Sequence, residues 1–248
     1  MDKVTVRETV WDALAERGAA RFPFPPHGRI PNFAGADDAC ERVTETDAWA
    51  SATTLKCNPD APQLPVRRAA LRAGKTVYMA QPRLRDPKPF LRLDPAEVDD
   101  VDEATTVSGV SKHGVPVAPE DVPHVDLVVS GSVAVTTAGD RIGKGEGYSD
   151  LEWAVLRELD AVDDDTTVAT TVHDLQVVDG PDSPISDPEE LPDPDAHDVP
   201  LDLVATPSRT IRTGTERTRP DGVDWDVLGD AKRSEIPVLA ERASGEDG

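Results

Sequence analysis

The stretch Gly139-Asp-Arg-Ile-Gly-Lys-Gly-Glu-Gly-Tyr-Ser-Asp150 decides the fold of this 248-residue chain. It follows the apolar segment His124–Val135, which gives the strongest strand signal in the sequence, and precedes an amphipathic segment from Ser149 to about Leu159. This order predicts a strand, a glycine-rich loop over Gly139–Gly147 and a helix. Alternating glycines let backbone N–H groups turn towards one point, and a helix N-terminus behind them favours an anion.

Charged residues within the loop point to the same chemistry. Arg141 and Lys144 place positive charge in an otherwise acidic chain, and Asp150 stands where the helix should begin. Asp150 is either an N-cap or a ligand for a metal ion that bridges phosphates. The spacing is neither that of a P-loop nor that of a dinucleotide fingerprint, so an ordinary turn with solvated cations stays open.

Segments on both sides of this unit alternate between strand and helix patterns. Strands are expected at Ser51–Asn58, Thr76–Ala80, Thr166–Val172 and Leu201–Ala205, and helices at Lys3–Arg17, Ala34–Trp49 and Pro65–Arg72. The alternation predicts an α/β fold with a mostly parallel sheet covered on both faces. Ligands of such sheets bind beyond the carboxyl ends of strands, which makes the loops after Leu55, Val129–Val135 and Ala205 candidates.

Three further segments lack a clear period. Four prolines make Arg21–Phe33 a fixed loop, in which Phe22, Phe24 and Phe33 are expected as packing anchors. Residues 90–123 are poorly periodic, and the Asp- and Pro-rich segment Asp179–Pro200 predicts a surface loop.

We expect one domain over residues 1–212 and an acidic extension over 213–248. Short helices of that extension pack back through Trp225, Leu228, Ile236 and Leu239, and its last residues are expected to be disordered.

The composition excludes several classes of function. With 48 Asp and Glu against 26 Lys and Arg, the net charge is −22, so nucleic acid is not an expected partner. Asp outnumbers Glu by 32 to 16 and Arg outnumbers Lys by 19 to 7, a pattern typical of cytosolic proteins of extreme halophiles. We therefore attribute the acidity to a saline environment, the alternative being an acidic surface that docks a basic protein.

The remaining sequence signals favour a cytoplasmic protein without a zinc site. No apolar run is long enough to span a membrane, and no signal peptide pattern opens the chain. Cys40 and Cys57 are expected to be reduced and buried, because their spacing matches no metal site. The five histidines are scattered, and His173 and His197 are expected to order loops.

The loop resembles the signature G-x-R-L-G-x-G-x-G-Y-Y-D of the 5-formyltetrahydrofolate cyclo-ligase (methenyltetrahydrofolate synthetase) family. The chain looks most like the methenyltetrahydrofolate synthetase domain-containing branch of that family, and the resemblance covers essentially the whole chain. Further matches are Arg29-Ile-Pro-Asn-Phe-Ala-Gly35, His173-Asp-Leu-Gln-Val-Val178 and His197-Asp-Val-Pro-Leu-Asp-Leu-Val-Ala-Thr206.

This resemblance implies a three-layer α/β/α sandwich of the NagB/RpiA/CoA-transferase-like type. It also implies ATP- and Mg²⁺-dependent cyclisation of 5-formyltetrahydrofolate to 5,10-methenyltetrahydrofolate, by a monomer or weak dimer. The residues that match, or fall nearest to, the family's functional positions form four groups. They are Arg141, Lys144 and Tyr148 for catalysis; Lys3, Arg7, Gly143, Lys144, Gly145, Gly147 and Tyr148 for ATP; Asp150 for Mg²⁺; and Asp60 for the folate.

Two residues of the loop keep a second hypothesis open. Ser149 replaces the second aromatic residue of the signature, and Glu146, where glycine is usual in the family, places a carboxylate inside a phosphate loop, where it would repel a triphosphate. The folate-binding Glu of the family has no clean equivalent, and Asp60 is either its substitute or a turn residue before Pro62. The alternative function is a non-catalytic regulator that binds nucleotide or folate on the same fold.

The charge balance leads to a prediction about salt. We expect the free energy of unfolding to rise steadily from low salt to molar KCl, because counterions screen the repulsion among carboxylates. Urea titrations at several KCl concentrations, followed by circular dichroism, measure this dependence. Maximal stability at low salt would contradict the halophilic interpretation.

Overall fold

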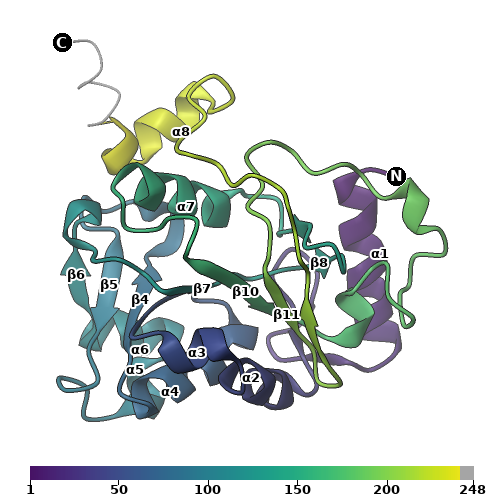
Figure 1. Cartoon of the computed structure of the whole chain (residues 1–248), viewed down its shortest axis with the longest axis horizontal. Helices are drawn as coiled ribbons and strands as arrows, with labels where there is room; N and C mark the ends of the chain where they lie inside the picture. The colour runs from purple at the N-terminus through teal and green to yellow at the C-terminus, as the bar shows by residue number, and fades with distance from the viewer. Residues whose placement is uncertain (241–248) are drawn as a thin grey trace.

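A computed structural model describes residues 1–240 of the chain, and residues 241–248, where the disordered end was expected, lie outside it. The described residues form a central sheet with helices on both faces (Figure 1). Helices α2 to α6 cover one face, and α7 and α8 lie on the other. The predicted α/β/α sandwich is therefore confirmed.

The helices are short and separated by loops. Their bounds are α1 Lys3–Glu16, α2 Ala36–Thr44, α3 Asp47–Ser51, α4 Leu64–Arg72, α5 Val101–Ala104, α6 Val107–His113, α7 Tyr148–Glu158 and α8 Asp230–Glu235. The strands are β1 Ala20–Arg21, β2 Asn32–Phe33, β3 Thr54–Cys57, β4 Thr76–Ala80, β5 Phe90–Leu93, β6 Val115–Val117, β7 Leu127–Val129, β8 Ala134–Val135, β9 Arg141–Ile142, β10 Thr167–Thr171, β11 Leu203–Ala205 and β12 Thr210–Arg212.

The large sheet is parallel at its centre. Within the described residues its strand order is β12-β11-β10-β7-β3-β4-β5-β6. The five strands from β11 to β4 run parallel. At one edge β12 pairs antiparallel with β11, and at the other β5 pairs antiparallel with β4 and β6 pairs antiparallel with β5. The carboxyl ends of β3, β4 and β7 consequently lie side by side at one edge of the sheet, where the loops that carry the functional candidates begin.

Alternate residues of the central strands build two cores. Leu127 and Val129 of β7 pack with residues of α2, α3 and α4, whereas Val128 packs with residues of α7. A strand buried on both faces has to be apolar at every position, which explains why this segment gave the strongest strand signal. A third core joins Val6, Val10 and Leu14 of α1 to the β8 region.

Two expected elements are divided in the structure. The helix expected over Ala34–Trp49 is two helices, because the Thr46 hydroxyl accepts a hydrogen bond from the Trp49 N–H and starts α3. The strand expected over His124–Val135 ends at Val129 and resumes as β8 in a separate hairpin with β9. Arg141 and Ile142, which were expected within the glycine loop, form β9, so residues 143–147 connect this hairpin, and not the central strand, to α7.

The poorly periodic segment contains short elements, and the expectation for two aromatic residues of the Pro-rich loop was wrong. Residues 90–123 contain β5, β6, α5 and α6, elements of three to seven residues that are too short to show a period. Phe22 and Phe24 are not packing anchors, since their exposed fractions are 77% and 61%, whereas Phe33 is buried as expected. Backbone pairing of β1 with β2 holds this loop in place.

The C-terminal segment packs on the outside of α7. Ile236 and Leu239 are buried in the same core as the inner face of α7, and Trp225 and Leu228 pack against that core. The proposed division of the chain at residue 212 stays a prediction. None of the helices in the described range has the length and apolarity needed to cross a membrane, and the cytoplasmic location also stays a prediction.

This packing predicts the effect of shortening a core side chain in the C-terminal segment. Leu239→Ala should lower the free energy of unfolding by about 2–4 kcal/mol, because it leaves a cavity in the α7 core. The control Val227→Ala lies in the same segment but is exposed and should change the free energy of unfolding little. Urea unfolding in high salt measures both, and equal effects would contradict the packing of the segment.

Candidate active site at the glycine loop

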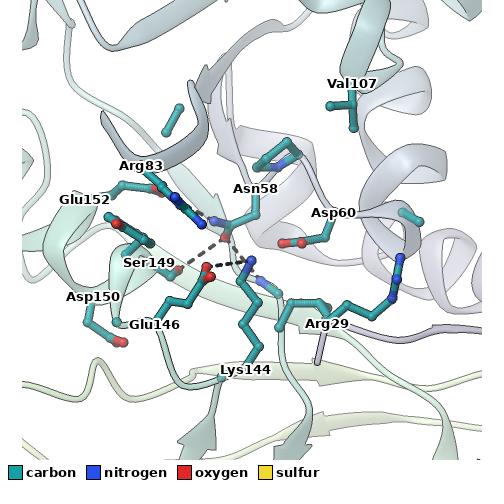
Figure 2. Close-up of a pocket in the computed structure, with 18 of the residues that line it drawn as sticks. Arg29, Asn58, Asp60, Arg83, Val107, Lys144, Glu146, Ser149, Asp150 and Glu152 are labelled. Atoms are coloured by element: carbon teal, nitrogen blue, oxygen red, sulfur yellow. Dashed lines mark hydrogen bonds and ion pairs between the residues drawn. The ribbon is translucent and has the colours of Figure 1, made fainter. Parts of the chain in front are cut away.

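A cavity of about 410 Å³ opens beyond the carboxyl ends of β3, β4 and β7. Its walls come from the Pro-rich loop, the loops after β3, β4 and β7, the glycine loop and the first turn of α7, and Figure 2 shows many of these residues. The polar residues among its lining are Arg29, Asn58, Asp60, Gln81, Arg83, Arg141, Lys144, Glu146, Tyr148, Ser149, Asp150 and Glu152.

Two of the three loops expected at the site line this cavity. Asn58 and Asp60 follow β3, and Gly131 follows β7. The third expectation was wrong, because the loop after Ala205 lies elsewhere: the Thr206 hydroxyl donates to the Asp174 carboxylate. The carboxyl end of β4 takes its place and contributes Ala80 and Gln81.

The glycine loop adopts a backbone conformation that requires glycine. Gly145 has φ +102° and Gly147, the N-cap residue of α7, has φ +71°. Side chains other than glycine are strained at such angles. The loop thereby ends on the free N–H groups of the first turn of α7, the arrangement that favours bound anions.

Arg141 and Asp150 form a buried ion pair beneath the loop. The Arg141 Nη2 atom lies 2.5 and 2.6 Å from the two carboxylate oxygens of Asp150, and Nη1 donates to the Gly131 carbonyl at 2.9 Å. Burial alone would lower the pKa of Arg141, but the Asp150 carboxylate outweighs it and raises that pKa. The guanidinium group is therefore permanently charged and joins β9 to α7. The catalytic role of Arg141 stays a prediction.

Lys144 is the cation of the loop that faces the cavity. Its Nζ atom forms an ion pair with Glu146 at 2.7 Å, and both side chains are about one-third exposed (Figure 2). The negative charge expected to repel a triphosphate is thus offset within the loop. Tyr148, the first residue of α7, also lines the cavity, and the Lys232 Nζ atom of α8 lies 5.3 Å from its ring centroid.

The two cations expected from the first helix bind different partners. The Arg7 Nε atom donates to the Gly143 carbonyl at 2.6 Å, and its guanidinium group lies close to Gly145, so Arg7 supports the loop. Lys3 instead forms ion pairs with Asp195 at 2.7 Å and Asp198 at 2.5 Å. Lys3 is therefore not part of the cavity lining, and its contact with a nucleotide stays a prediction.

Asp60 lies in the cavity with its carboxylate opposite Lys144 (Figure 2). Burial raises the pKa of this carboxyl group, and the nearby Lys144 opposes the rise. Among the described residues no hydrogen bond to its carboxylate is found. A Cβ atom at Gly131 would lie 2.8 Å from this carboxylate, so only glycine fits there. Asp60 thus has acceptor oxygens available to a ligand.

A buried polar cluster beside the cavity escaped the sequence reasoning. Lys56 of β3 forms an ion pair with Glu152 of α7, and both are nearly inaccessible to solvent. The Asn58 side chain donates to Glu152, and the Ser149 hydroxyl donates to the Asn58 side chain (Figure 2). One signal was available, because Lys56 and Glu152 are single opposite charges inside two apolar segments.

Two more arginines line the cavity. Arg29 belongs to the Pro-rich loop, which forms one wall together with Pro23 and Ile30. Arg83 follows β4 in a left-handed conformation, with φ 63°. No local pattern marked Arg83, since only the fold brings this loop to the cavity.

The cysteines and His173 take the structural roles expected of them. Cys40 and Cys57 are free and buried, and burial raises their pKa values to about 12 and about 11, so both stay protonated thiols. Burial lowers the pKa of His173, whose Nδ1 atom accepts a hydrogen bond from the Leu175 N–H. Asp195, His197 and Asp198 cluster near Lys3, which forms ion pairs with both carboxylates.

Comparison with known proteins places this site in a family. Residues 1–207 match the sequence model of the 5-formyltetrahydrofolate cyclo-ligase family. The chain is 41% identical to the methenyltetrahydrofolate synthase domain-containing protein of Bos taurus, over 96% of this chain and 61% of that protein. It is 40% identical to the protein of the same name from Mus musculus, over 100% of this chain and 66% of that protein. The chain thus spans about three-fifths to two-thirds of the length of these relatives.

A solved structure supports the fold. The NMR structure of Aquifex aeolicus 5,10-methenyltetrahydrofolate synthetase aligns with a TM-score of 0.53 at 19% identity, covering 88% of this chain and 96% of that chain. At this level of identity the likeness concerns the fold alone. The match over residues 1–207 carries the assignment: the chain belongs to the 5-formyltetrahydrofolate cyclo-ligase family, a family of ligase enzymes.

Proposed function

We propose that this protein cyclises 5-formyltetrahydrofolate to 5,10-methenyltetrahydrofolate with ATP and Mg²⁺. The observation that carries the proposal is one cavity in which the Asp60 carboxylate faces Lys144 and the N-terminus of α7. A hydrogen-bond acceptor for a pterin and backbone N–H donors for phosphate thus line the same cavity, within the residues that match the family.

Asp60 suits the pterin. The pterin ring carries adjacent N–H donors, and a carboxylate offers paired acceptor oxygens for them. The availability of the Asp60 carboxylate in the cavity favours this role over that of a turn residue. Arg29 and Arg83 at the cavity wall add positive charge suited to the carboxylates of a folate tail.

The proposed reaction has two chemical steps. The formyl oxygen attacks the γ-phosphorus of ATP, the bond from that phosphorus to the bridging oxygen breaks, and ADP leaves. The neighbouring N10 amine then attacks the activated formyl carbon, phosphate departs, and the N10 proton is released. The products are 5,10-methenyltetrahydrofolate, ADP and phosphate. Catalysis of such a transfer depends mainly on positioning and on stabilising charge.

The loop provides both effects. Backbone N–H groups at the N-terminus of α7 hold anionic oxygens, and Lys144 places its charge beside the transferred group once a triphosphate displaces Glu146 from it. Arg7 holds the Gly143 carbonyl and so fixes the loop that carries these donors. Tyr148 closes the cavity at the end of the loop.

Asp150 fits the role of a magnesium ligand. Its Oδ2 atom accepts one hydrogen bond from Arg141 and keeps acceptor capacity, and the side chain lines the cavity. Mg²⁺ in nucleotide sites uses one or two carboxylates together with phosphate oxygens. When bound, Mg²⁺ would neutralise charge on the phosphates.

One observation favours the alternative of a non-catalytic regulator. Glu146 forms an ion pair with the ammonium group of Lys144, and the phosphoryl transfer requires this cation. A regulator of this kind would bind ATP or folate and show no turnover.

We predict product formation that depends on ATP and on Asp150. Purified protein in molar KCl with Mg²⁺, ATP and 5-formyltetrahydrofolate should generate the near-ultraviolet absorbance of the methenyl product. Asp150→Asn should lower kcat by about 100-fold or more, because it removes the carboxylate that binds the metal. The control Asp102→Asn, in a surface ion pair with Arg68, should retain activity.

Thermal melting separates loss of chemistry from loss of folding, since Asp150 also pairs with Arg141. Absence of product together with thermal stabilisation by ATP or folate would support the regulator. Absence of both product and stabilisation would contradict the proposed function.

Asp60→Asn should separate substrate binding from stability. Burial raises the pKa of Asp60, so its ionised form costs folding free energy at neutral pH. The amide removes that cost, so the variant should melt at a higher temperature than the wild type at neutral pH. The difference should vanish as the pH falls and Asp60 becomes protonated. The same variant should lose about tenfold or more in kcat/KM for the folate. Unchanged kinetics would indicate a turn residue.

A further inference from the structure

A lysine of the C-terminal segment contacts the backbone of the glycine loop. The Lys232 Nζ atom of α8 donates to the Glu146 carbonyl at 2.6 Å. The same ammonium group lies 5.3 Å from the ring centroid of Tyr148, and a Cβ atom at Gly147 would lie 3.4 Å from it. Lys232 lies beyond residue 207, where the match to the family ends, so the match says nothing about this contact.

Packing on α7 fixes the place of this ammonium group. Before Lys232 in the sequence, the Pro220 carbonyl accepts a hydrogen bond of 3.1 Å from the Trp153 Nε1 atom of α7. After it, Ile236 and Leu239 are buried in the same core as the inner face of α7, on which α8 lies (Figure 1). Lys232 is thus held between two points of attachment to the helix that follows the loop.

The contact determines the orientation of one peptide group. The peptide bond between Glu146 and Gly147 is trans, so its C=O and N–H bonds point in opposite directions. Glu146 and Gly147 line the cavity of the candidate active site, whereas Lys232 does not. With the carbonyl turned to Lys232, the N–H of Gly147 points away from it. Within residues 1–240 this N–H donates to no protein acceptor, so it is available to a ligand.

Arg7 makes the equivalent contact at the start of the loop. Its Nε atom donates to the Gly143 carbonyl at 2.6 Å, and the peptide bond from Gly143 to Lys144 is also trans. Arg7, like Lys232, is not part of the cavity lining. Two cations outside the cavity therefore hold two carbonyls of the loop, and the N–H groups of the same peptides turn the other way. Donors that are oriented in advance bind an anion without a cost of reorganisation.

We propose that Lys232 is a positioning residue, which acts through the Glu146 carbonyl to keep the N–H of Gly147 turned towards the phosphates of the bound substrate. The inference rests on the proposed function, which supplies the triphosphate. It makes a residue after 207 part of the machinery that binds phosphate. Because Lys232 acts through the loop, its loss weakens the binding of phosphate and leaves the binding of the folate unchanged.

The test measures phosphate binding and folate binding separately. Isothermal titration in molar KCl with Mg²⁺ gives the dissociation constants for inorganic tripolyphosphate, for ATP and for 5-formyltetrahydrofolate. Lys232→Met removes the ammonium group and keeps most of the apolar stem. It should weaken the binding of tripolyphosphate and of ATP about tenfold, because the loop loses a hydrogen bond from a charged donor, and should bind the folate as the wild type does. Lys232→Arg keeps a charged donor and should restore most of the lost affinity.

The matched control is Arg233→Met, which removes the same charge from the adjacent position of α8. Arg233 contacts only its own segment among the described residues: its Nε atom donates to the Leu228 carbonyl at 2.9 Å, and its guanidinium group lies 5.9 Å from the Trp225 ring centroid. Arg233→Met should bind tripolyphosphate as the wild type does. Equal losses in Lys232→Met and Arg233→Met would indicate that net charge matters and not the contact, and would overturn the inference.

Two other results would also overturn the inference and leave the proposed function standing. One is wild-type affinity for both phosphate ligands in Lys232→Met, and the other is an affinity in Lys232→Arg as low as in Lys232→Met. A wild-type protein that binds neither tripolyphosphate nor ATP would overturn the proposed function, and the inference with it. Melting curves identify a variant that fails to fold, and Lys232→Gln is then judged by the same outcomes in place of Lys232→Met.

Discussion

The ion pair between Arg141 and Asp150 is the interaction on which the site depends. It joins the β8–β9 hairpin to the first turn of α7, and its remaining hydrogen bonds reach the Gly131 carbonyl after β7 and the Val199 N–H before β11. Four segments are thus fixed around one ion pair. Removing one partner of such a buried pair leaves an uncompensated charge, which costs about 3–5 kcal/mol. The geometry of the glycine loop between Arg141 and Asp150 follows from this constraint.

A second buried pair fixes the same helix from the other side. Lys56 of β3 and Glu152 of α7 lie two residues from Asn58 and Asp150 respectively, so the strand end that leads to Asp60, the proposed pterin acceptor, is tied to the helix that follows the glycine loop. Buried ion pairs add little net stability compared with apolar packing, but they penalise every arrangement in which the partners separate. In this protein they hold two halves of a candidate active site in register.

The distribution of charge is as informative as its total. The chain carries a net charge of −22, yet Arg7, Lys144 and Lys232 all gather at one glycine loop. Carboxylates spread over a surface keep a protein soluble in salt, whereas binding an anionic substrate requires a local region of positive electrostatic potential. The three cations come from α1, the loop and α8, so the reversal exists only in the folded chain. The C-terminal segment contributes one of them, although it lies beyond the residues matched to the family.

The sequence by itself determined the parallel α/β architecture, the glycine loop before α7 and the candidacy of Asp60, Lys144 and Asp150. Those features depend on local period and on residues close together in the chain, which a single sequence displays. Only the tertiary structure decided that Arg141 is committed to Asp150, that Lys3 pairs with acidic residues outside the cavity and that Arg83 enters it. It also decided the buried pairing of Lys56 with Glu152 and the place of Lys232 above the loop. These contacts join residues nine to almost two hundred positions apart, and no local propensity encodes which distant partner a charged side chain will meet.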